Sequence, residues 1–279
     1  MGKETGIAWC HHTMNPWIGC TKVSAGCAHC YAESQDHRWG NDSWGPGKIR
    51  RVTSVNYWRQ PLLWAKDAAK AGVRRRVFCA SMADVFDAEA PVDFRRNLWS
   101  LIGETCQYLD WLICTKRPER IISVMDDDYL NAGFFELCKC WLLTTVENQE
   151  NEDRIEALCE VDALVHGISA EPLLGPLAIE PYLVDWAGKG GMINWVIVGG
   201  ESGQKARPCD VAWVRSIVDQ CKDAEVPVFV KQMGDYSTRV DPTDDVRGPV
   251  TKRILWQKRA GSDPAEWPAD LQVRQFPIP

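Results

Sequence analysis

Three cysteines crowd into a short stretch near the start of the chain, with the spacing Cys20-x6-Cys27-x2-Cys30. Gly19 and Gly26 lie beside them and let the backbone fold around something small. Thiolates this close in sequence usually share a metal ion or a metal cluster. The spacing therefore predicts a metal site, and we expect the rest of the chain to present that site to a substrate.

Two kinds of metal centre fit these thiolates. A structural zinc ion takes four ligands in a closed tetrahedron, and the fourth can come from Cys10, His11, His12 or His29. A cubane [4Fe–4S] cluster has four irons, so three cysteines leave one iron open for a substrate or a cofactor. Both interpretations stay open on the spacing alone.

Polar residues follow each of six apolar runs that have the composition of β-strands. In parallel barrels the chemistry gathers at the carboxyl ends of the strands, so we expect these residues to line a site. The alternative is that βα loops are polar because they face water. The candidates are Ser81, Asp84, Thr115, Lys116, Arg117, Glu147, Glu171, Gly199, Gly200, Glu201, Ser202 and Lys231.

Two of these groups suggest particular ligands. The glycine pair in Gly199-Gly200-Glu201 lets a ligand approach the backbone, and the carboxylate can accept hydrogen bonds from an amine. The motif matches neither the dinucleotide fingerprint nor the P-loop, so no nucleoside triphosphate is implied. Lys116-Arg117 can bind a carboxylate or a phosphate, or it can be a solvated charge pair at a helix end.

Strand-like and helix-like segments alternate along the chain. The strand candidates are mostly continuous apolar runs, as expected for parallel strands covered on both faces; they span 77–81, 110–114, 140–146, 163–169, 194–199 and 226–231. Helices are expected over 31–39, 58–71, 92–107, 118–125, 150–160, 173–186 and 210–224. With a first strand at 7–9, this predicts an α/β fold, a full or partial TIM-barrel-like (β/α) barrel of about six to seven parallel strands. A doubly wound sheet is the runner-up.

No clean linker divides the chain. We expect one barrel domain over 1–234 that carries the cysteine loop, and an irregular C-terminal extension over 235–279 packed on the barrel. The extension is rich in proline and glycine, with a strand expected over 251–256; its turn residues include Pro242, Gly248, Pro249, Pro277 and Pro279.

Composition restricts the cellular setting. The chain has no apolar run of 18 residues, so we expect neither a membrane span nor a membrane partner. Residues Met1 to Gly6 lack the apolar core of a secretory signal, which predicts a cytosolic protein. Its 12 cysteines should therefore be mostly reduced, and those outside the loop should behave as small hydrophobic residues.

Charge is distributed unevenly along the chain. The net charge of −6 argues against a protein that coats nucleic acid non-specifically. The basic block, residues 37–76, nevertheless holds ten Lys or Arg against two acids and carries five aromatic side chains. Because aromatic rings stack on unpaired bases while Arg and Lys meet phosphates, this block predicts a contact with nucleic acid or a nucleotide. The alternative is that its arginines are solvated and its tryptophans lie in the core.

The cysteine loop followed by a βα barrel resembles the radical S-adenosylmethionine (SAM) superfamily, with His29 in the ring position before the last cysteine. More closely, the chain resembles a phage-borne and bacterial radical-SAM-like family over most of residues 7–234. The shared motifs are Asn15-Pro16, Gly19-Cys20-Thr21-Lys22-Val23-Ser24, Gly26-Cys27, Cys30-Tyr31-Ala32-Glu33, Thr115-Lys116-Arg117-Pro118, Glu171-Pro172-Leu173-Leu174-Gly175-Pro176-Leu177, Trp195-Val196-Ile197-Val198-Gly199-Gly200-Glu201-Ser202-Gly203 and Lys231-Gln232.

The resemblance implies a mechanism. Cys20, Cys27 and Cys30 would ligate three irons of a [4Fe–4S] cluster, and SAM would chelate the fourth. An electron from a donor protein would then cleave SAM into methionine and a 5′-deoxyadenosyl radical. The candidate residues at the strand ends would bind the cofactor. Glu201 follows a late strand rather than an early one, so it would instead bind substrate.

Further expectations concern the setting and the substrate. The protein would work in the bacterial host cytoplasm if it is phage-encoded, and nucleic acid modification would be its activity if the basic block binds the substrate. Two other functions compete with this one. The first is a zinc-stapled nucleic-acid-binding protein without catalysis, and the second is an inactive iron–sulfur barrel that serves as a partner subunit.

Overall fold

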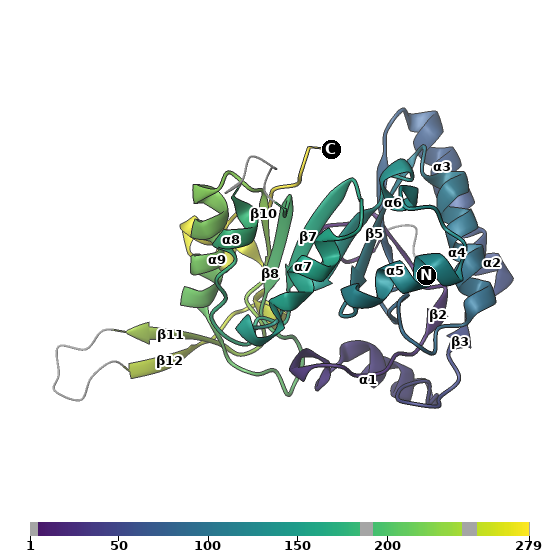
Figure 1. Cartoon of the computed structure of the whole chain (residues 1–279). Helices are drawn as coiled ribbons and strands as arrows, with labels where there is room; N and C mark the ends of the chain where they lie inside the picture. Colours follow the sequence, from purple (N-terminus) through teal and green to yellow (C-terminus); the bar gives the residue numbers. More distant parts are fainter. Residues whose placement is uncertain (1–4, 185–191, 242–249, 279) are drawn as a thin grey trace. The chain divides into compact units, whose positions relative to one another are not determined.

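A computed structural model describes residues 5–184, 192–241 and 250–278 (Figure 1). The chain divides into two compact units, and each is described by itself below. The first unit comprises Met1–Thr144 with Glu156–His166, and the second comprises Thr145–Ile155 with Gly167–Pro279. Residues 1–4, the predicted turn residues Pro242, Gly248, Pro249 and Pro279, and positions 185–186 of a predicted helix lie outside the described residues.

A seven-stranded sheet runs through the chain, and its strands follow one another in chain order. In the first unit β1 pairs with β4, β4 with β5 and β5 with β6, and in the second β7 pairs with β8 and β8 with β10; all of these pairs are parallel. A doubly wound sheet would reverse its strand order at a switch point, and this sheet does not. The predicted α/β fold of the partial (β/α) barrel type is therefore confirmed. The strands are β1 (His12–Met14), β4 (Arg75–Cys79), β5 (Leu109–Thr115), β6 (Trp141–Thr145), β7 (Val165–Ala170), β8 (Trp195–Gly199) and β10 (Val228–Gln232).

Helices of the first unit pack against its strands. Helix α3 (Gln60–Ala71) has Pro61 in its first turn and ends at Gly72, whose φ of 64° suits a left-handed cap. Helix α4 (Val92–Thr105) buries Leu98 and Ile102 in the core. The remaining elements are β2 (Trp17–Ile18) paired with β3 (Arg51–Val52), α1 (Tyr31–Arg38), α2 (Val55–Trp58), α5 (Ile121–Asp127), α6 (Phe134–Leu137) and the 3-10 turns η1 (Ala25–Cys27) and η2 (Pro118–Arg120). Beyond them, η3 (Gln149–Asn151) and α7 (Asp153–Cys159) precede β7.

In the second unit, α9 (Val211–Asp223) covers strands β8 and β10. Asp210 caps it, and the Asp210 Oδ1 atom accepts a hydrogen bond from the Ala212 N–H at 2.8 Å. A second sheet joins β9 (Cys209–Asp210), β11 (Ser237–Asp241) and β12 (Val250–Ile254). The other elements are α8 (Glu180–Leu183), η4 (Arg259–Gly261), η5 (Pro264–Glu266) and η6 (Ala269–Leu271).

The C-terminal extension completes the second unit. Residues near the end of the chain pair antiparallel with β10: the Val230 N–H donates to the Val273 carbonyl, and the Gln275 N–H donates to the Val228 carbonyl, both at 2.9 Å. An open strand edge is thereby covered. The described part of the extension belongs to the same compact unit as β8 and β10. The proposed domain boundary after residue 234 stays a prediction.

Two predicted elements are wrong in place or length. The first strand is β1 at His12–Met14 rather than at 7–9, because residues 12–14 are the ones from the start of the chain that pair with Val77–Cys79 of β4. Of the helix expected over 173–186, only Glu180–Leu183 is helical in the described part. Gly175 and Pro176 interrupt its start, since proline cannot donate the backbone hydrogen bond that a helix interior needs.

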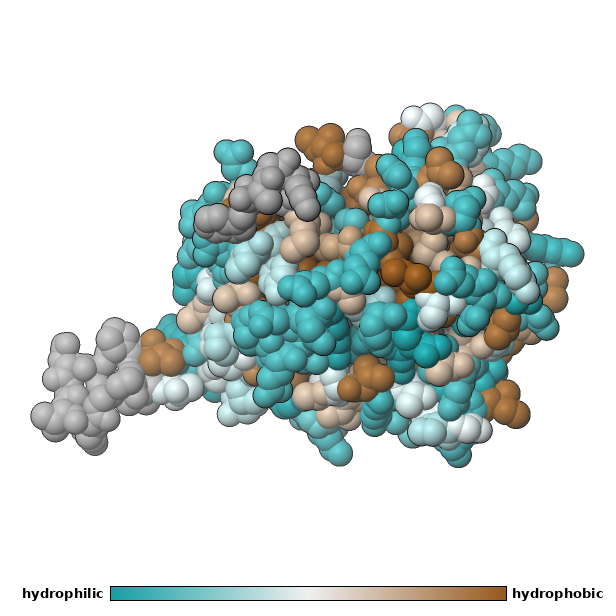
Figure 2. All heavy atoms as spheres, in the orientation of Figure 1, coloured by the Kyte–Doolittle hydropathy of each residue, from teal (hydrophilic) through white to brown (hydrophobic). Residues whose placement is uncertain are grey.

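No helix among the described residues is both long and apolar enough to cross a membrane. Figure 2 shows hydrophilic residues over much of the face in view, with apolar residues in scattered groups.

Candidate functional site

The three cysteines of the loop are placed by short elements that follow β1. Cys20 comes just after β2, Cys27 ends η1, and Cys30 is the residue before α1. Cys20 is buried, and the other two are half-buried. No disulfide joins any of the twelve cysteines in the structure, and their reduced state in the cell stays a prediction.

A small apolar cluster surrounds two of the three sulfurs. Cys20 packs with Ile18, Ala32, Trp44 and Met82, and Cys30 lies against the same cluster. The Nε1 atom of Trp44 is buried and has no hydrogen-bond partner among the described residues. A buried N–H without an acceptor costs free energy, so the Trp44 N–H would gain from an acceptor placed within its reach.

Burial controls the protonation of the loop. It raises the pKa of the Cys20 thiol to about 12, with Asp84 acting in the same direction and Arg117 against it. Burial also raises the pKa of Cys30, while the N–H groups of Glu33 and Ala32 at the start of α1 lower it. Both cysteines are therefore thiols in the apoprotein, and metal binding would displace their protons.

Arg117 connects the strand ends to the loop. It is buried, and its Nη1 atom donates to the Cys20 Sγ at 3.5 Å and to the Asp84 Oδ2 at 3.0 Å. Its Nη2 atom donates to the Thr21 carbonyl. Burial alone would lower the pKa of Arg117, but Asp84, Cys20 and Asp87 outweigh that effect and raise it.

The Asp84 carboxylate, which pairs with Arg117, accepts several further hydrogen bonds. Its carboxylate accepts hydrogen bonds from the Thr115 hydroxyl at 2.9 Å, the Lys116 N–H at 3.1 Å and the Phe86 N–H at 3.0 Å. The structure therefore brings the predicted residues Asp84, Thr115 and Arg117 together, and their side chains support the cysteine loop.

Arg50 holds the loop from the other side. Its Nη2 atom donates to the Thr21 hydroxyl at 2.7 Å, and its Nε atom donates to the Asp87 Oδ2 at 2.9 Å. Thr21, the residue after Cys20, is thus bound by Arg50 through its hydroxyl and by Arg117 through its carbonyl. We call Arg50, Asp84, Asp87 and Arg117 the charged clamp. Sequence reasoning missed Arg50 and Asp87 as site residues, because no local motif marks them.

Further contacts join the loop to the segment after β4. The Tyr31 hydroxyl donates to the Ser81 carbonyl, and the Ser81 hydroxyl donates to the Asn15 Oδ1 at 3.2 Å. Lys22 and Glu33 form an ion pair at 2.7 Å. Ser81, a predicted site residue, therefore lies beside the loop.

The predicted residues of the second unit are largely engaged with one another or with neighbours. Glu147 is buried and accepts from the Arg154 Nη1 at 2.9 Å. Glu171 and Lys231, two of the predicted residues, form an ion pair with each other. Ser202 is exposed. These residues do occur where their strands end.

The Gly199-Gly200-Glu201 motif has a structural explanation. A Cβ atom on Gly200 would lie 2.2 Å from the Met233 carbonyl oxygen, so this glycine permits the approach of a backbone from the same unit. Glu201 is buried and accepts side-chain hydrogen bonds from Arg207, among them one from Nη2 at 2.6 Å and one from Nε at 2.9 Å. The carboxylate expected to bind an amine is thus paired within the chain.

The alternative zinc ligands Cys10, His11 and His12 each contact other groups of the first unit. The Cys10 Sγ contacts the Ile7 carbonyl at 3.9 Å, and the His11 Nδ1 accepts from the Arg76 N–H at 2.9 Å. The His12 ring stacks on Trp64, with 4.4 Å between ring centroids. Within residues 5–184, 192–241 and 250–278, no group of three or more Cys, His, Asp or Glu side chains converges on one metal ion. His29 remains within the loop itself.

The surroundings of the loop suit a sulfur-rich group. Ligands of a cluster bind different irons and need not converge on one point, whereas the four ligands of zinc lie about 2.0–2.3 Å from one ion. An apolar cluster, an N–H donor to Cys20 and the unpartnered Trp44 N–H suit a sulfur-rich group. Cys20, Cys27 and Cys30 would hold it.

In the basic block, several side chains are used inside the first unit. Arg50 belongs to the charged clamp, and the Arg74 Nε atom donates to the Asp110 Oδ1 at 2.8 Å. Trp44 and Trp64 are buried, while Trp39 is exposed. The expectation that this block's arginines are simply solvated is wrong for Arg50, and contact of the block with nucleic acid stays a prediction.

Comparison with known proteins gives one family and one group of solved structures. The family model described as "Protein of unknown function (DUF5131)" matches residues 4–264. No curated protein matches. A spore photoproduct lyase mutant with bound AdoMet and dinucleoside spore photoproduct is 11% identical with a TM-score of 0.49, covering 92% of this chain and 72% of that chain. A second spore photoproduct lyase mutant has 11% identity, the same coverages and a TM-score of 0.47.

Proposed function

The chain belongs to the DUF5131 family, and we propose that it is a radical SAM enzyme. In this proposal Cys20, Cys27 and Cys30 hold a [4Fe–4S] cluster, and S-adenosylmethionine is the second cofactor. When bound, the cluster would supply the electron that cleaves SAM into methionine and a 5′-deoxyadenosyl radical, and an electron donor protein would be needed to reduce it.

One observation carries the proposal, namely the environment of the cysteine loop. Cys20 and Cys30 lie at one apolar cluster that contains the unpartnered Trp44 N–H, and Arg117 donates to the Cys20 Sγ. Apolar surroundings and N–H···S contacts are the means by which a protein tunes a cluster. The cysteine spacing and the motifs of the resemblance support the same conclusion.

The chain's own residues have definite tasks in this proposal. The charged clamp holds Thr21 by two atoms and so fixes the backbone directly after Cys20. The start of α1 directs the N–H groups of Ala32 and Glu33 toward Cys30, which favours its thiolate. The apolar cluster keeps water from Cys20, because the residues around it leave little of its surface exposed.

Anaerobic reconstitution with iron and sulfide tests the proposal. We expect about four irons and four sulfides per chain, as a cubane cluster requires, and formation of 5′-deoxyadenosine when SAM and a reductant are added. Replacing Cys20, Cys27 or Cys30 by alanine should abolish both. Cys106→Ala is the matched control, because Cys106 is a partly buried free thiol outside the loop.

A colourless protein with one tightly bound zinc ion would overturn the proposal and favour the zinc-stapled alternative. A loaded cluster without 5′-deoxyadenosine would instead favour the inactive iron–sulfur subunit.

Nucleic acid as the substrate class belongs to the proposal as well, and its support comes from the basic block.

A further inference from the structure

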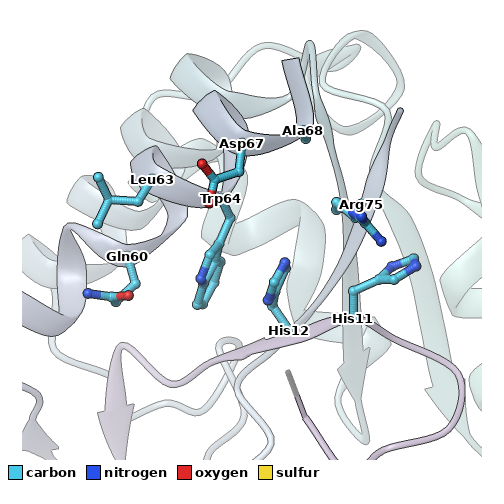
Figure 3. Close-up of a pocket in the computed structure, with 8 residues that line it drawn as sticks. All are labelled: His11, His12, Gln60, Leu63, Trp64, Asp67, Ala68 and Arg75. Atoms are coloured by element: carbon cyan, nitrogen blue, oxygen red, sulfur yellow. The ribbon is translucent and has the colours of Figure 1, made fainter. Parts of the chain in front are cut away.

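A pocket of about 350 Å³ opens in the first unit at the amino-terminal ends of its strands (Figure 3). His12 is the first residue of β1, and Arg75 is the first residue of the parallel strand β4. Cys20 comes after the carboxyl end of β1, so the pocket lies at the opposite end of the strands from the cysteine loop. Its lining consists of His11, His12, Gln60, Leu63, Trp64, Asp67, Ala68 and Arg75.

Helix α3 supplies one wall of this pocket. Its five lining residues follow the spacing i, i+3, i+4, i+7, i+8 and therefore share one helix face. The His12 ring stacks on Trp64 with an interplanar angle of 4°, which gives the wall a flat aromatic layer. In Figure 3 the His12 ring lies between Trp64 and Arg75. A planar ligand can extend this stack.

Arg75 differs from the arginines on either side of it. Side chains alternate between the faces of a strand, so Arg76 lies on the other face of β4 from Arg75, and neither Arg74 nor Arg76 lines the pocket. The Arg74 Nε atom donates to Asp110 at 2.8 Å, and the Arg76 Nε atom donates to the Trp9 carbonyl at 3.1 Å. Within the described part of the chain, neither Arg75 nor the pocket's Asp67 makes a side-chain hydrogen bond or an ion pair. The Arg75 guanidinium and the Asp67 carboxylate thus line the same pocket without a hydrogen-bond or ion-pair partner among the described residues.

We propose that this pocket binds a single nucleotide whose base carries an amino group. The base extends the His12–Trp64 stack. Arg75 binds the phosphate through its planar fork, and Asp67 accepts a hydrogen bond from the base amino group. A simple anion would not use the stacked rings and would be repelled by Asp67. A purely apolar ligand would leave both charges desolvated and unpaired.

The position of the pocket defines its role. A nucleotide bound here is not the reacting group, because the pocket and the cysteine loop lie at opposite ends of the strands. The pocket instead anchors a nucleotide of a larger nucleic acid or a free nucleotide. This inference goes beyond the proposed cluster chemistry and does not depend on it.

Isothermal titration calorimetry of the full-length protein with GMP, AMP, CMP, UMP and inorganic phosphate tests the inference. We expect at least one of the three nucleotides with an amino group to bind at least tenfold more tightly than UMP. Arg75→Gln should weaken its binding at least tenfold. Lys70→Gln should leave it unchanged, because Lys70 is an exposed cation of the same helix that does not line the pocket. Asp67→Ala should remove the preference over UMP, because alanine has no side-chain oxygen that accepts from the base amino group.

Three results would overturn the inference. They are the absence of binding for every nucleotide at millimolar concentration, an equal loss in the Arg75 and Lys70 variants, and phosphate binding as tight as that of the nucleotides. Circular dichroism checks that each variant is folded. Binding should survive Cys27→Ala, so a failure of the cluster chemistry and a failure of the pocket can be told apart.

Discussion

Cys20 is the cysteine of the loop whose surroundings are most completely defined. Arg117 donates to its sulfur, and Trp44 packs beside it with a buried N–H that lacks a partner among the described residues. Hydrogen bonds to the sulfurs of a cluster are among the factors that set its reduction potential. Asp84, Thr21 and Cys20 engage the Arg117 guanidinium, so Arg117 positions the loop, and its binding of a carboxylate or a phosphate stays a prediction.

The Trp44 indole provides a test at the level of one atom. Trp44→Phe keeps an aromatic ring in the apolar cluster but removes the N–H, so the reduction potential of the reconstituted cluster should fall. A tenfold weaker tendency to be reduced corresponds to about 59 mV for one electron. A dye-mediated redox titration followed in the visible spectrum measures the shift.

The matched control for this substitution is Trp39→Phe, since Trp39 is 53% exposed in the same stretch of chain. It should leave the potential unchanged. An intact cluster with the same potential in wild type and Trp44→Phe would show that the indole N–H has no part in tuning the cluster.

Among the elements, the turn between β2 and the cysteine loop is the most constrained. The Gly19 N–H donates to the Met82 carbonyl at 3.0 Å, which joins the loop to the segment after β4. Gly19 has a φ of +117°, and a Cβ atom there would lie 2.1 Å from the Ser43 carbonyl oxygen. That oxygen also accepts from the Arg50 Nη1 at 3.1 Å, so the turn and the charged clamp are mechanically linked.

Gly19→Ala should therefore lower the free energy of unfolding by more than the unfavourable backbone conformation alone would, because the added methyl group also meets the Ser43 carbonyl oxygen. Gly45→Ala is the control, because Gly45 has a φ of +103° and open space around its Cβ position. Both variants incur the left-handed penalty of about 1–2 kcal/mol, and Gly19→Ala should lose roughly 1–3 kcal/mol more through overpacking. Urea unfolding of the apoprotein measures the difference, and equal losses would contradict the proposed link.

At the scale of the whole molecule, the chain leaves the first unit after Thr144 and returns to it at Glu156. Leu158 and Val161 of the returning segment are buried in the core cluster that also contains Phe135 and Leu142. The core of the first unit therefore needs the returning segment Glu156–His166 to be complete.

This arrangement predicts the behaviour of fragments. A fragment of residues 1–166 should unfold at a higher temperature than one of residues 1–144, which lacks Leu158 and Val161. Truncating a large buried aliphatic side chain typically costs about 2–5 kcal/mol, so the difference should be readily visible. Thermal unfolding followed by circular dichroism measures it. Equal transition temperatures would mean that the returning segment adds nothing to the first unit.

Local sequence patterns were sufficient for much of the fold. Continuous apolar runs predicted six strands of the main sheet to within a few residues. Parallel strands are covered on both faces, so nearly all of their residues are apolar whatever strand they pair with. The polar start of β1 carried no such signal, and its position was missed. Pairing with β4 decides it, since a three-residue strand exists only through its ladder partner.

The sequence by itself determined the three cysteines, their spacing and where along the chain most strands form, because these depend on residues near one another in the chain. Only the tertiary structure decided what surrounds them. The charged clamp joins Thr21 to arginines at positions 50 and 117, and Arg207 occupies the Glu201 carboxylate. The nucleotide pocket likewise needs His12, Trp64 and Arg75 from three elements. Such contacts depend on how distant segments pack, because burial and partners, rather than residue type, set what a charged side chain can bind.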